Sequence, residues 1–323
     1  MKRITILLIL FTFSITAQAQ TLRVTSSTSE IMHLSASITS NSVLIAEGNG
    51  SELVRGNYSA PVSDPSLETY VFPDGSFIVR ENIANFLVYD SFGQVKKSIS
   101  NSTQSEGGEA ISELAADQFG KTVVLYNPKV IMNGVTGSRA KIINSKKTPL
   151  DIYYSQDREL SLVEVSSNGE FVAFISVKAG SDDEVQLMDR FGNELKKLAF
   201  DQPVKGASFS ENGLFVTIYS GSRAAAYEVR SGERVGSTSF RNTSVIFASY
   251  DPIDKTIVGL SGSGSSTISD IQLHAVNVAA RKIARENMDG SLEVVGQIKM
   301  QRIGSGRYTI LGLDNELSLR ADF

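Results

Sequence analysis

Few residues in this chain could carry acid–base or metal chemistry. The chain has no cysteine and only two histidines, His33 and His274. Zinc and copper sites normally gather several His, Cys or carboxylate ligands in one place. The two histidines are far apart in the sequence, and each lies in a strand-like apolar run. We therefore interpret each as an ordinary half-buried histidine rather than as a ligand or a general base.

Two other segments have compositions that suggest a ligand. Asp182-Asp183-Glu184 is the densest acidic cluster, but it lacks the alternating oxygen ligands and the glycine turn of a calcium loop. Residues 259–266 are rich in Gly and Ser, but the Gly-Lys-Ser/Thr and the helix of a phosphate-binding loop do not follow. We interpret the first segment as a solvated hairpin loop and the second as a flexible hairpin loop.

Nucleophile motifs give no better candidate. The sequence contains no Gly-x-Ser-x-Gly elbow, and two histidines in strand-like runs do not suggest a Ser/His/acid triad. The sequence therefore predicts no catalytic residue, no metal ligand and no cofactor. Carboxylates and tyrosines that converge from distant segments would leave no linear motif, so an enzyme stays open as an alternative.

The ends and the charge of the chain indicate where it acts. Lys2 and Arg3 precede a short apolar run, and Ala17-Gln18-Ala19 supplies the small residues that signal peptidase recognises. We expect cleavage after Ala19, and export to the periplasm or the exterior of a Gram-negative-type bacterium. Because no cysteine follows the apolar run, a lipoprotein is not expected. The formal charge of −4 becomes −6 without Lys2 and Arg3, which argues against nucleic-acid partners.

The mature chain reads as one repeated unit. Val88–Lys97 in the sequence resembles 187–197, with a weaker copy at 226–235; each reads as a strand, a tight glycine turn and an outgoing strand. Upstream of each copy, a turn leads into an apolar run: Pro73-Asp74-Gly75, Asn168-Gly169 and Asn212-Gly213. Asn-Gly and Asp-Gly are favoured in two-residue hairpin turns, and the runs that follow have strand composition.

The period of the repeat indicates the architecture. Similar turns recur near positions 42, 75, 120, 169, 213, 254 and 306, a mean spacing of about 44 residues. Four-stranded propeller blades repeat at about this length, and seven occurrences predict seven blades. Residues 171–177 are apolar on both faces except Ser176, as expected for a strand covered by neighbouring blades. We also interpret residues 277–286 as a hairpin rather than a helix.

The turn segments carry a resemblance to a known group. Residues 72–79, 166–174 and 208–216 are similar to the Ser-Pro-Asp-Gly-x-aromatic-aliphatic pattern of WD-repeat-like propellers in bacterial envelope proteins. Weaker versions cover nearly the whole mature chain, although Gly-His and Trp-Asp signatures are absent. The resemblance implies an all-β propeller. For function it implies only a range of binding and enzymatic roles.

These observations predict a signal peptide over 1–19 and a single propeller domain over 20–323. The last unit offers three strands, at 292–302, 307–313 and 317–321, so we expect the β-prone stretch 22–27 to complete it and close the ring. The leading function is a non-enzymatic binding or scaffolding module. Its partner would be another envelope protein, and one version is a subunit of an outer-membrane assembly. A periplasmic lyase or hydrolase with its site in the central channel is the alternative.

Overall fold

The computed structural model describes residues 21–27, 42–47, 50–55, 58–62, 69–72, 76–90, 94–117, 119–143, 149–240 and 244–323. The described residues form strands and no helix, and the sheets are antiparallel. The predicted signal peptide, His33 and the turns Pro73-Asp74-Gly75 and Ser91-Phe92-Gly93 lie outside them. The all-β fold class is confirmed.

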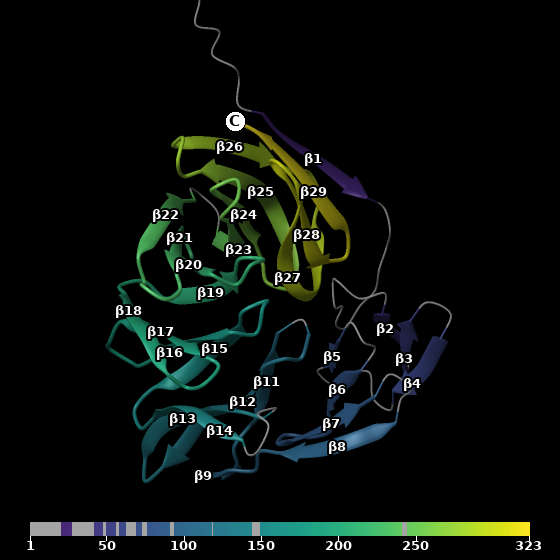
Figure 1. The fold of residues 1–323 in the computed structure, drawn as a ribbon, viewed down its shortest axis with the longest axis vertical. Helices are drawn as coiled ribbons and strands as arrows, with labels where there is room; N and C mark the ends of the chain where they lie inside the picture. The colour runs from purple at the N-terminus through teal and green to yellow at the C-terminus, as the bar shows by residue number, and fades with distance from the viewer. Residues whose placement is uncertain are drawn as a thin grey trace, which may run out of the picture.

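Two four-stranded sheets in the middle of the chain show how the repeat folds. In each, consecutive strands are neighbours, and Figure 1 shows the first strand toward the middle of the molecule and the fourth on its outside. The strands are β15 (Glu159–Val165), β16 (Phe171–Val177), β17 (Asp183–Asp189) and β18 (Glu194–Phe200), then β19 (Val204–Phe209), β20 (Phe215–Ser220), β21 (Arg223–Glu228) and β22 (Arg234–Ser239).

Apolar side chains hold these two sheets face to face. Phe171, Ile175 and Leu187 of the first sheet pack against Val216 and Ile218 of the second, and all five are buried. Burying side chains of this size contributes about 2 kcal/mol each. Strand β16 is covered on both faces as predicted, and even Ser176 is buried.

The Asn-Gly turns are longer than the two-residue loops predicted. Strand β15 ends at Val165 and β16 begins at Phe171, so Asn168-Gly169 lies in the middle of the connection. The Ser166 hydroxyl accepts hydrogen bonds from the backbone N–H groups of Glu170 (3.2 Å) and Phe171 (2.9 Å). Gly169 has φ +66°, which glycine adopts without strain. The turn position was therefore predicted and the turn type was wrong.

Residues 42–155 form four further sheets of two to four strands (Figure 1). A three-stranded sheet precedes a four-stranded one, a small hairpin and another four-stranded sheet. They are β2 (Ser42–Glu47), β3 (Gly50–Arg55) and β4 (Tyr58–Val62); β5 (Thr69–Val71), β6 (Phe77–Arg80), β7 (Asn85–Tyr89) and β8 (Val95–Ser100); β9 (Gln104–Ser105) and β10 (Gly108–Glu109); β11 (Glu113–Ala116), β12 (Val123–Met132), β13 (Val135–Ile142) and β14 (Leu150–Ser155).

The last strands of the chain join into one eight-stranded sheet. Strand β25 pairs with β24 and β26, and its first two residues also pair with β27. The strands are β23 (Ser244–Asp251), β24 (Thr256–Ser263), β25 (Thr267–Asn277), β26 (Lys282–Asn287), β27 (Leu292–Gly304), β28 (Arg307–Leu313), β29 (Glu316–Asp322) and β1 (Thr21–Ser27). The hairpin predicted at 277–286 is confirmed.

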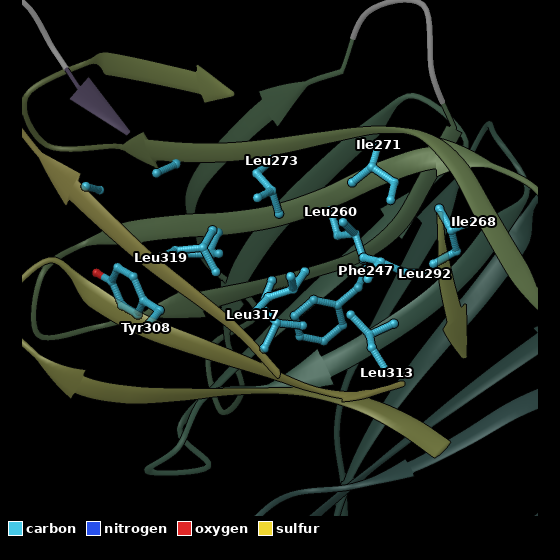
Figure 2. Close-up of a cluster of buried hydrophobic side chains, with 14 of the residues drawn as sticks. Phe247, Leu260, Ile268, Ile271, Leu273, Leu292, Tyr308, Leu313, Leu317 and Leu319 are labelled. Atoms are coloured by element: carbon cyan, nitrogen blue, oxygen red, sulfur yellow. The ribbon is translucent and has the colours of Figure 1, made fainter. Parts of the chain in front are cut away.

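The largest buried cluster lies within this sheet. Figure 2 shows Phe247, Leu260, Leu273, Leu317 and Leu319 pointing toward one another from strands β23, β24, β25 and β29. Leu317, Leu319 and Ala321, which alternate along β29, therefore point into the core. The cluster ties together the strands that a propeller would divide between its last two blades.

A polar corner links the same strands at one end. The Arg302 guanidinium on β27 lies 3.2 Å from the Asp251 carboxylate and 3.1 Å from that of Asp254. The Tyr308 hydroxyl lies within hydrogen-bond distance of both carboxylates, 3.2 Å from Asp251 and 3.1 Å from Asp254, and the Gly306 N–H donates to Asp254 at 2.8 Å. Asp251 is almost fully buried, so these donors offset the cost of burying its charge.

The N-terminal strand lies where the sequence predicts it. Strand β1 pairs antiparallel with β29 over its whole length, from Thr21 opposite Asp322 to Ser27 opposite Glu316. The three strands expected in the last unit are β27, β28 and β29. The first strand of the chain therefore covers the edge that its last strand would otherwise expose.

Candidate functional site

The hairpin of β12 and β13 builds the first candidate site. Its tip is Asn133-Gly134, and both residues have positive φ, 54° and 73°. Tips of this composition fit tight two-residue hairpins, which lets the two strands extend to the tip. The Gly134 N–H donates to the Glu106 carboxylate at 2.6 Å, and the Glu106 N–H donates to the Ile131 carbonyl at 2.8 Å. The tip is therefore fixed to the segment before β11.

A groove of about 370 Å³ lies beside this hairpin. Three large apolar side chains line it and remain largely exposed: Met132 at 60%, Val135 at 50% and Tyr154 at 70%. Single exposed apolar residues are common on protein surfaces, whereas several in one hollow are typical of binding sites. Exposed apolar side chains and a concave shape coincide in this groove.

A buried polar network supports the groove. The Asn127 carbonyl oxygen accepts from Asn101 (3.1 Å), from Thr103 (3.1 Å) and from the Arg139 guanidinium (2.9 Å). The Asn127 amide donates to the Ile111 carbonyl at 3.0 Å and to the Ser112 hydroxyl at 2.9 Å. These bonds pair both ends of the Asn127 amide, which holds that side chain in one arrangement, while the side-chain oxygen of Asn101 is buried without a partner among the described residues. The groove therefore has a rigid base.

The second candidate site is a polar cluster between strands β15 and β27, which belong to two sheets that are distant in sequence. The Gln297 amide on β27 donates to both carboxylate oxygens of Glu164 on β15, at 2.9 and 3.0 Å. Lys299 also belongs to β27, and its charge acts on Glu164. Between Val294 and Lys299 the register of β27 against β28 shifts, so a bulge carries Gln297 away from the ladder.

Tyr219 reaches the same cluster from a third sheet. It lies opposite Gly206 in the β19–β20 ladder, and a Cβ on Gly206 would lie 2.3 Å from its ring. Because Gly206 has no side chain, the Tyr219 ring leans across strand β19. Burial, and then the charge of Glu164, raise the pKa of the Tyr219 hydroxyl.

Burial dominates the electrostatics of this axial cluster, which we define as Glu164, Gln297, Lys299 and Tyr219. Burial raises the pKa of Glu164 to about 7, although Lys299 and the Gln297 hydrogen bond lower it. Burial lowers the pKa of the Lys299 amine, while the charges of Glu164 and Asp117 raise it. Both effects follow from taking charged groups away from bulk water.

The histidine that the structure describes is a core residue. His274 is 1% exposed, so the prediction of a half-buried residue was wrong in degree. Its Nε2 lies 3.0 Å from the Ser261 hydroxyl, and the Phe240 ring packs edge-on at 4.4 Å between centroids. Burial, and then the charge of Arg285, lower the pKa of His274 to about 4. The ring is therefore neutral at pH 7.

The two predicted loops are corrected in part. Asp182 lies in a connection, but Asp183 and Glu184 belong to β17, and the Asp183 carboxylate accepts the Val204 N–H at 2.8 Å. Most of 259–266 is also strand: β24 continues to Ser263. A Cβ on Gly259 would lie 2.6 Å from the Phe240 ring. The glycine is required there by a close approach, which the sequence alone does not reveal.

Metal-binding and membrane features are absent from the described ranges. Within them, no three His, Cys, Asp or Glu side chains gather as a metal site would require. The same ranges hold no helix with the length and apolar character needed to cross a membrane.

Comparison with known proteins shows the fold and no family. No protein-family model matches the chain, and no curated protein matches it. A chain in the crystal structure of the mitotic checkpoint complex is similar, with 12% identity, a TM-score of 0.55, and coverage of 92% of this chain and 90% of that one. The structure of KlHsv2 with loop 6CD replaced by a Gly-Ser linker is also similar, with 11% identity and a TM-score of 0.54. The match covers 84% of this chain and 85% of that one. These likenesses and the four-stranded antiparallel sheets show a WD40-like β-propeller fold.

Proposed function

We propose that this chain is a protein-interaction module that binds an extended segment of another protein in the groove beside the β12–β13 hairpin. The observation that carries the proposal is the clustering of Met132, Val135 and Tyr154, all largely exposed, around one hollow. Anchoring an apolar side chain there would remove these surfaces from water, which favours binding by about 25 cal/mol per Å². A rigid base lowers the entropy lost on binding.

The strand edge beside the groove favours an extended segment as the occupant. Strand β14 pairs with β13 only from Ser138 onward, whereas β13 begins at Val135. Within the described residues, the outer edge of β13 therefore has no strand partner at Val135 and Thr136. Extended peptides add to such edges by backbone hydrogen bonding, and pockets beside the edge select their side chains.

The setting of the module is part of the proposal. Residues 20–323 would form one domain of seven blades, exported after cleavage behind Ala19 and closed by β1. The partner would be a protein of a bacterial envelope, for which an outer-membrane assembly is one case. Support comes from the N-terminal sequence, the repeat of about 44 residues and the pairing of β1 with β29. Mass spectrometry of the exported protein should find Gln20 at its start, and an intact Met1 would contradict export by cleavage.

Affinity purification from solubilised envelopes tests the groove. The double variant Met132→Ser with Tyr154→Ser should lose a co-purifying protein at least tenfold. Phe191→Ser with Ile253→Ser is the matched control, because those side chains are 67% and 69% exposed away from the groove. The control should retain the partner. Equal loss in both variants, or purification of wild type alone, would contradict the proposal.

A lyase or hydrolase site in the central channel is the second candidate. The axial cluster favours it, because Glu164 and Lys299 carry opposite charges in surroundings that perturb the pKa of each. This candidate would be selected if the protein turned over a substrate, if Glu164→Gln abolished that turnover, and if the groove variant retained it.

A further inference from the structure

A pocket of about 440 Å³ lies between two neighbouring sheets, on the side of their outer strands. Strand β18 is the last strand of the first sheet, and β21 and β22 are the last two of the second (Figure 1). The pocket is lined by the end of β18 at Phe200, by Asp201 and Gln202 of the connection that follows, and by parts of β20, β21 and β22. Its volume falls within the size range of small-molecule sites.

Short side chains on the outer strands leave this space open. Ala225 of β21 lies opposite Ile218 of β20 and opposite Ser237 of β22, so all three side chains belong to one face of the sheet. Ile218 is buried against the neighbouring sheet. Ala225 and Ser237 border the pocket instead. The two sheets therefore meet at their inner strands and leave a hollow between their outer strands.

The same face of the second sheet carries an arginine toward each end of the pocket. Arg223 lies opposite Ser239, and Arg234 lies opposite Tyr227. Residues 223 and 227 are four positions apart on β21, so the two arginine backbones lie about 13 Å apart along the strands. Both arginine side chains are exposed and line the pocket, and within the described residues neither guanidinium has a carboxylate partner.

The two ends of the pocket differ in charge. The Ser220 hydroxyl donates to the Gln202 carbonyl oxygen at 2.9 Å and accepts the Arg223 backbone N–H at 3.2 Å, which places Gln202 and the adjacent Asp201 at the Arg223 end. Asp201 is the one acid among the described lining residues, so it offsets the charge of Arg223. The end at Arg234 keeps its positive charge.

We propose that this pocket binds a short acidic saccharide, with its carboxylate at Arg234 and its hydroxyl groups at Asp201 and Gln202. A guanidinium binds a carboxylate through two parallel hydrogen bonds. Sugar hydroxyls both donate and accept, so they match the acid, the amide and the guanidinium that meet at the Arg223 end. A plain inorganic anion would meet the Asp201 charge and leave these groups unused. The span between the arginines suits a disaccharide better than a single sugar.

The wall between the two ends fits a sugar ring. Phe200 of β18 and Tyr227 of β21 meet edge-on with 6.1 Å between their ring centroids, and both line the pocket while half-buried. They give the C–H groups of a sugar an apolar surface, and the Tyr227 hydroxyl adds a polar group on the same wall. The pocket shares no lining residue with the groove beside the β12–β13 hairpin, so this proposal holds independently of the proposed function.

Isothermal titration of the mature chain at pH 7.5 tests the ligand class. The probes are lactobionate, D-glucuronate and D-galacturonate, and the controls are lactose, sodium acetate and sodium sulfate. Lactobionate should bind with a Kd in the millimolar range or tighter, and lactose and acetate at least tenfold more weakly, because each lacks one half of the recognised chemistry. Sulfate that binds as tightly as lactobionate would overturn the saccharide class. No binding heat from any of the three acidic probes would overturn the proposal as a whole.

Variants then place the binding in the pocket. Arg234→Met should weaken lactobionate at least tenfold, and Ala225→Leu should do the same by filling the hollow without changing its charge. Arg320→Met is the matched control, because Arg320 is exposed on β29 outside the pocket, and it should leave the Kd unchanged. Asp201→Ala should narrow the difference between lactobionate and acetate to threefold or less. Lactobionate binding that survives both Arg234→Met and Ala225→Leu would overturn the proposal.

The groove variant Met132→Ser with Tyr154→Ser separates this site from the proposed function. It should bind lactobionate with an unchanged Kd while it loses the co-purifying protein. Arg234→Met should show the reverse, with lactobionate binding lost and the protein retained. Loss of lactobionate binding in the groove variant would contradict a separate site.

Discussion

The Gln297 amide and the Glu164 carboxylate meet at 2.9 and 3.0 Å although 133 positions separate them in the sequence. One lies on a bulge of β27 and the other on β15, in different sheets. The contact joins an early and a late part of the WD40-like fold. It also fixes the carboxylate whose pKa burial raises to about 7.

Glu164→Gln should change how stability depends on pH. Glutamate has a pKa of 4.5 when unperturbed and about 7 here, so between these values the folded chain keeps a proton that the unfolded chain has lost. The contribution of Glu164 to the free energy of unfolding therefore falls as pH rises through this window. Between pH 5 and pH 8, the free energy of unfolding measured in urea should rise by about 1 to 3 kcal/mol in the variant relative to wild type. A difference that does not vary with pH would contradict the burial of this charge.

His274→Leu should show the opposite sign. The pKa of His274 falls from 6.5 to about 4 on folding, so below pH 6.5 the unfolded chain takes up a proton that the folded chain refuses. Stability from this group is complete above pH 6.5 and is lost as pH falls toward 4. Relative to the variant, the free energy of unfolding of the wild type should fall by about 2 to 3 kcal/mol as the pH falls across that window. Denaturant unfolding of both proteins at pH 4.5 and 7 measures the effect, and parallel curves would argue against a neutral core histidine.

Removal of β1 should weaken the fold. Seven residue pairs join β1 to β29, and without them β29 becomes an open edge. A chain of residues 28–323 should unfold at a lower temperature and less cooperatively than residues 20–323, followed by circular dichroism. A synthetic peptide of residues 21–27 should restore part of the loss. Identical melting curves for the two chains would show that the pairing contributes nothing to stability.

Loss of Arg302 should be costly at the polar corner. Its guanidinium serves two carboxylates, one of them almost fully buried, and together with the Gly306 N–H it holds the pKa of Asp254 at about 2. Arg302→Met should lower the free energy of unfolding by about 3 kcal/mol, because a buried charge loses its partner. Adding Asp251→Asn to Arg302→Met removes the buried charge itself and should recover part of that loss. No recovery would mean that the destabilisation comes from lost packing instead.

Local signals in the sequence account for the strands and turns that were predicted correctly. The apolar run from Phe171 and the glycines at 169 and 213 act through neighbours in the chain, so their pattern is visible in one dimension. Gly259 was wrongly predicted to lie in a loop. A glycine is needed at this position because the ring of Phe240 packs against its backbone. Contacts between strands decide such positions, and a single sequence does not contain them.

The candidate sites were less accessible to prediction. Only one signal in the sequence could have pointed to them, a charged residue flanked by apolar residues within a strand. Glu164 lies between Val163 and Val165, and Lys299 lies between Ile298 and Met300. Their common location depends on a bulge and on distant sheets. The groove likewise depends on how Tyr154 of β14 lies beside the tip of the β12–β13 hairpin.

Site-specific photo-crosslinking in the native cell is the most direct test of the proposed interaction module. A photoreactive phenylalanine analogue would replace Val135 or Tyr154 in the groove, and Phe191 or Ile253 as exposed controls outside it. The account predicts that both groove positions crosslink to the same protein and that neither control position does. Crosslinks to that protein from the control positions alone, or no protein captured from either groove position, would contradict it.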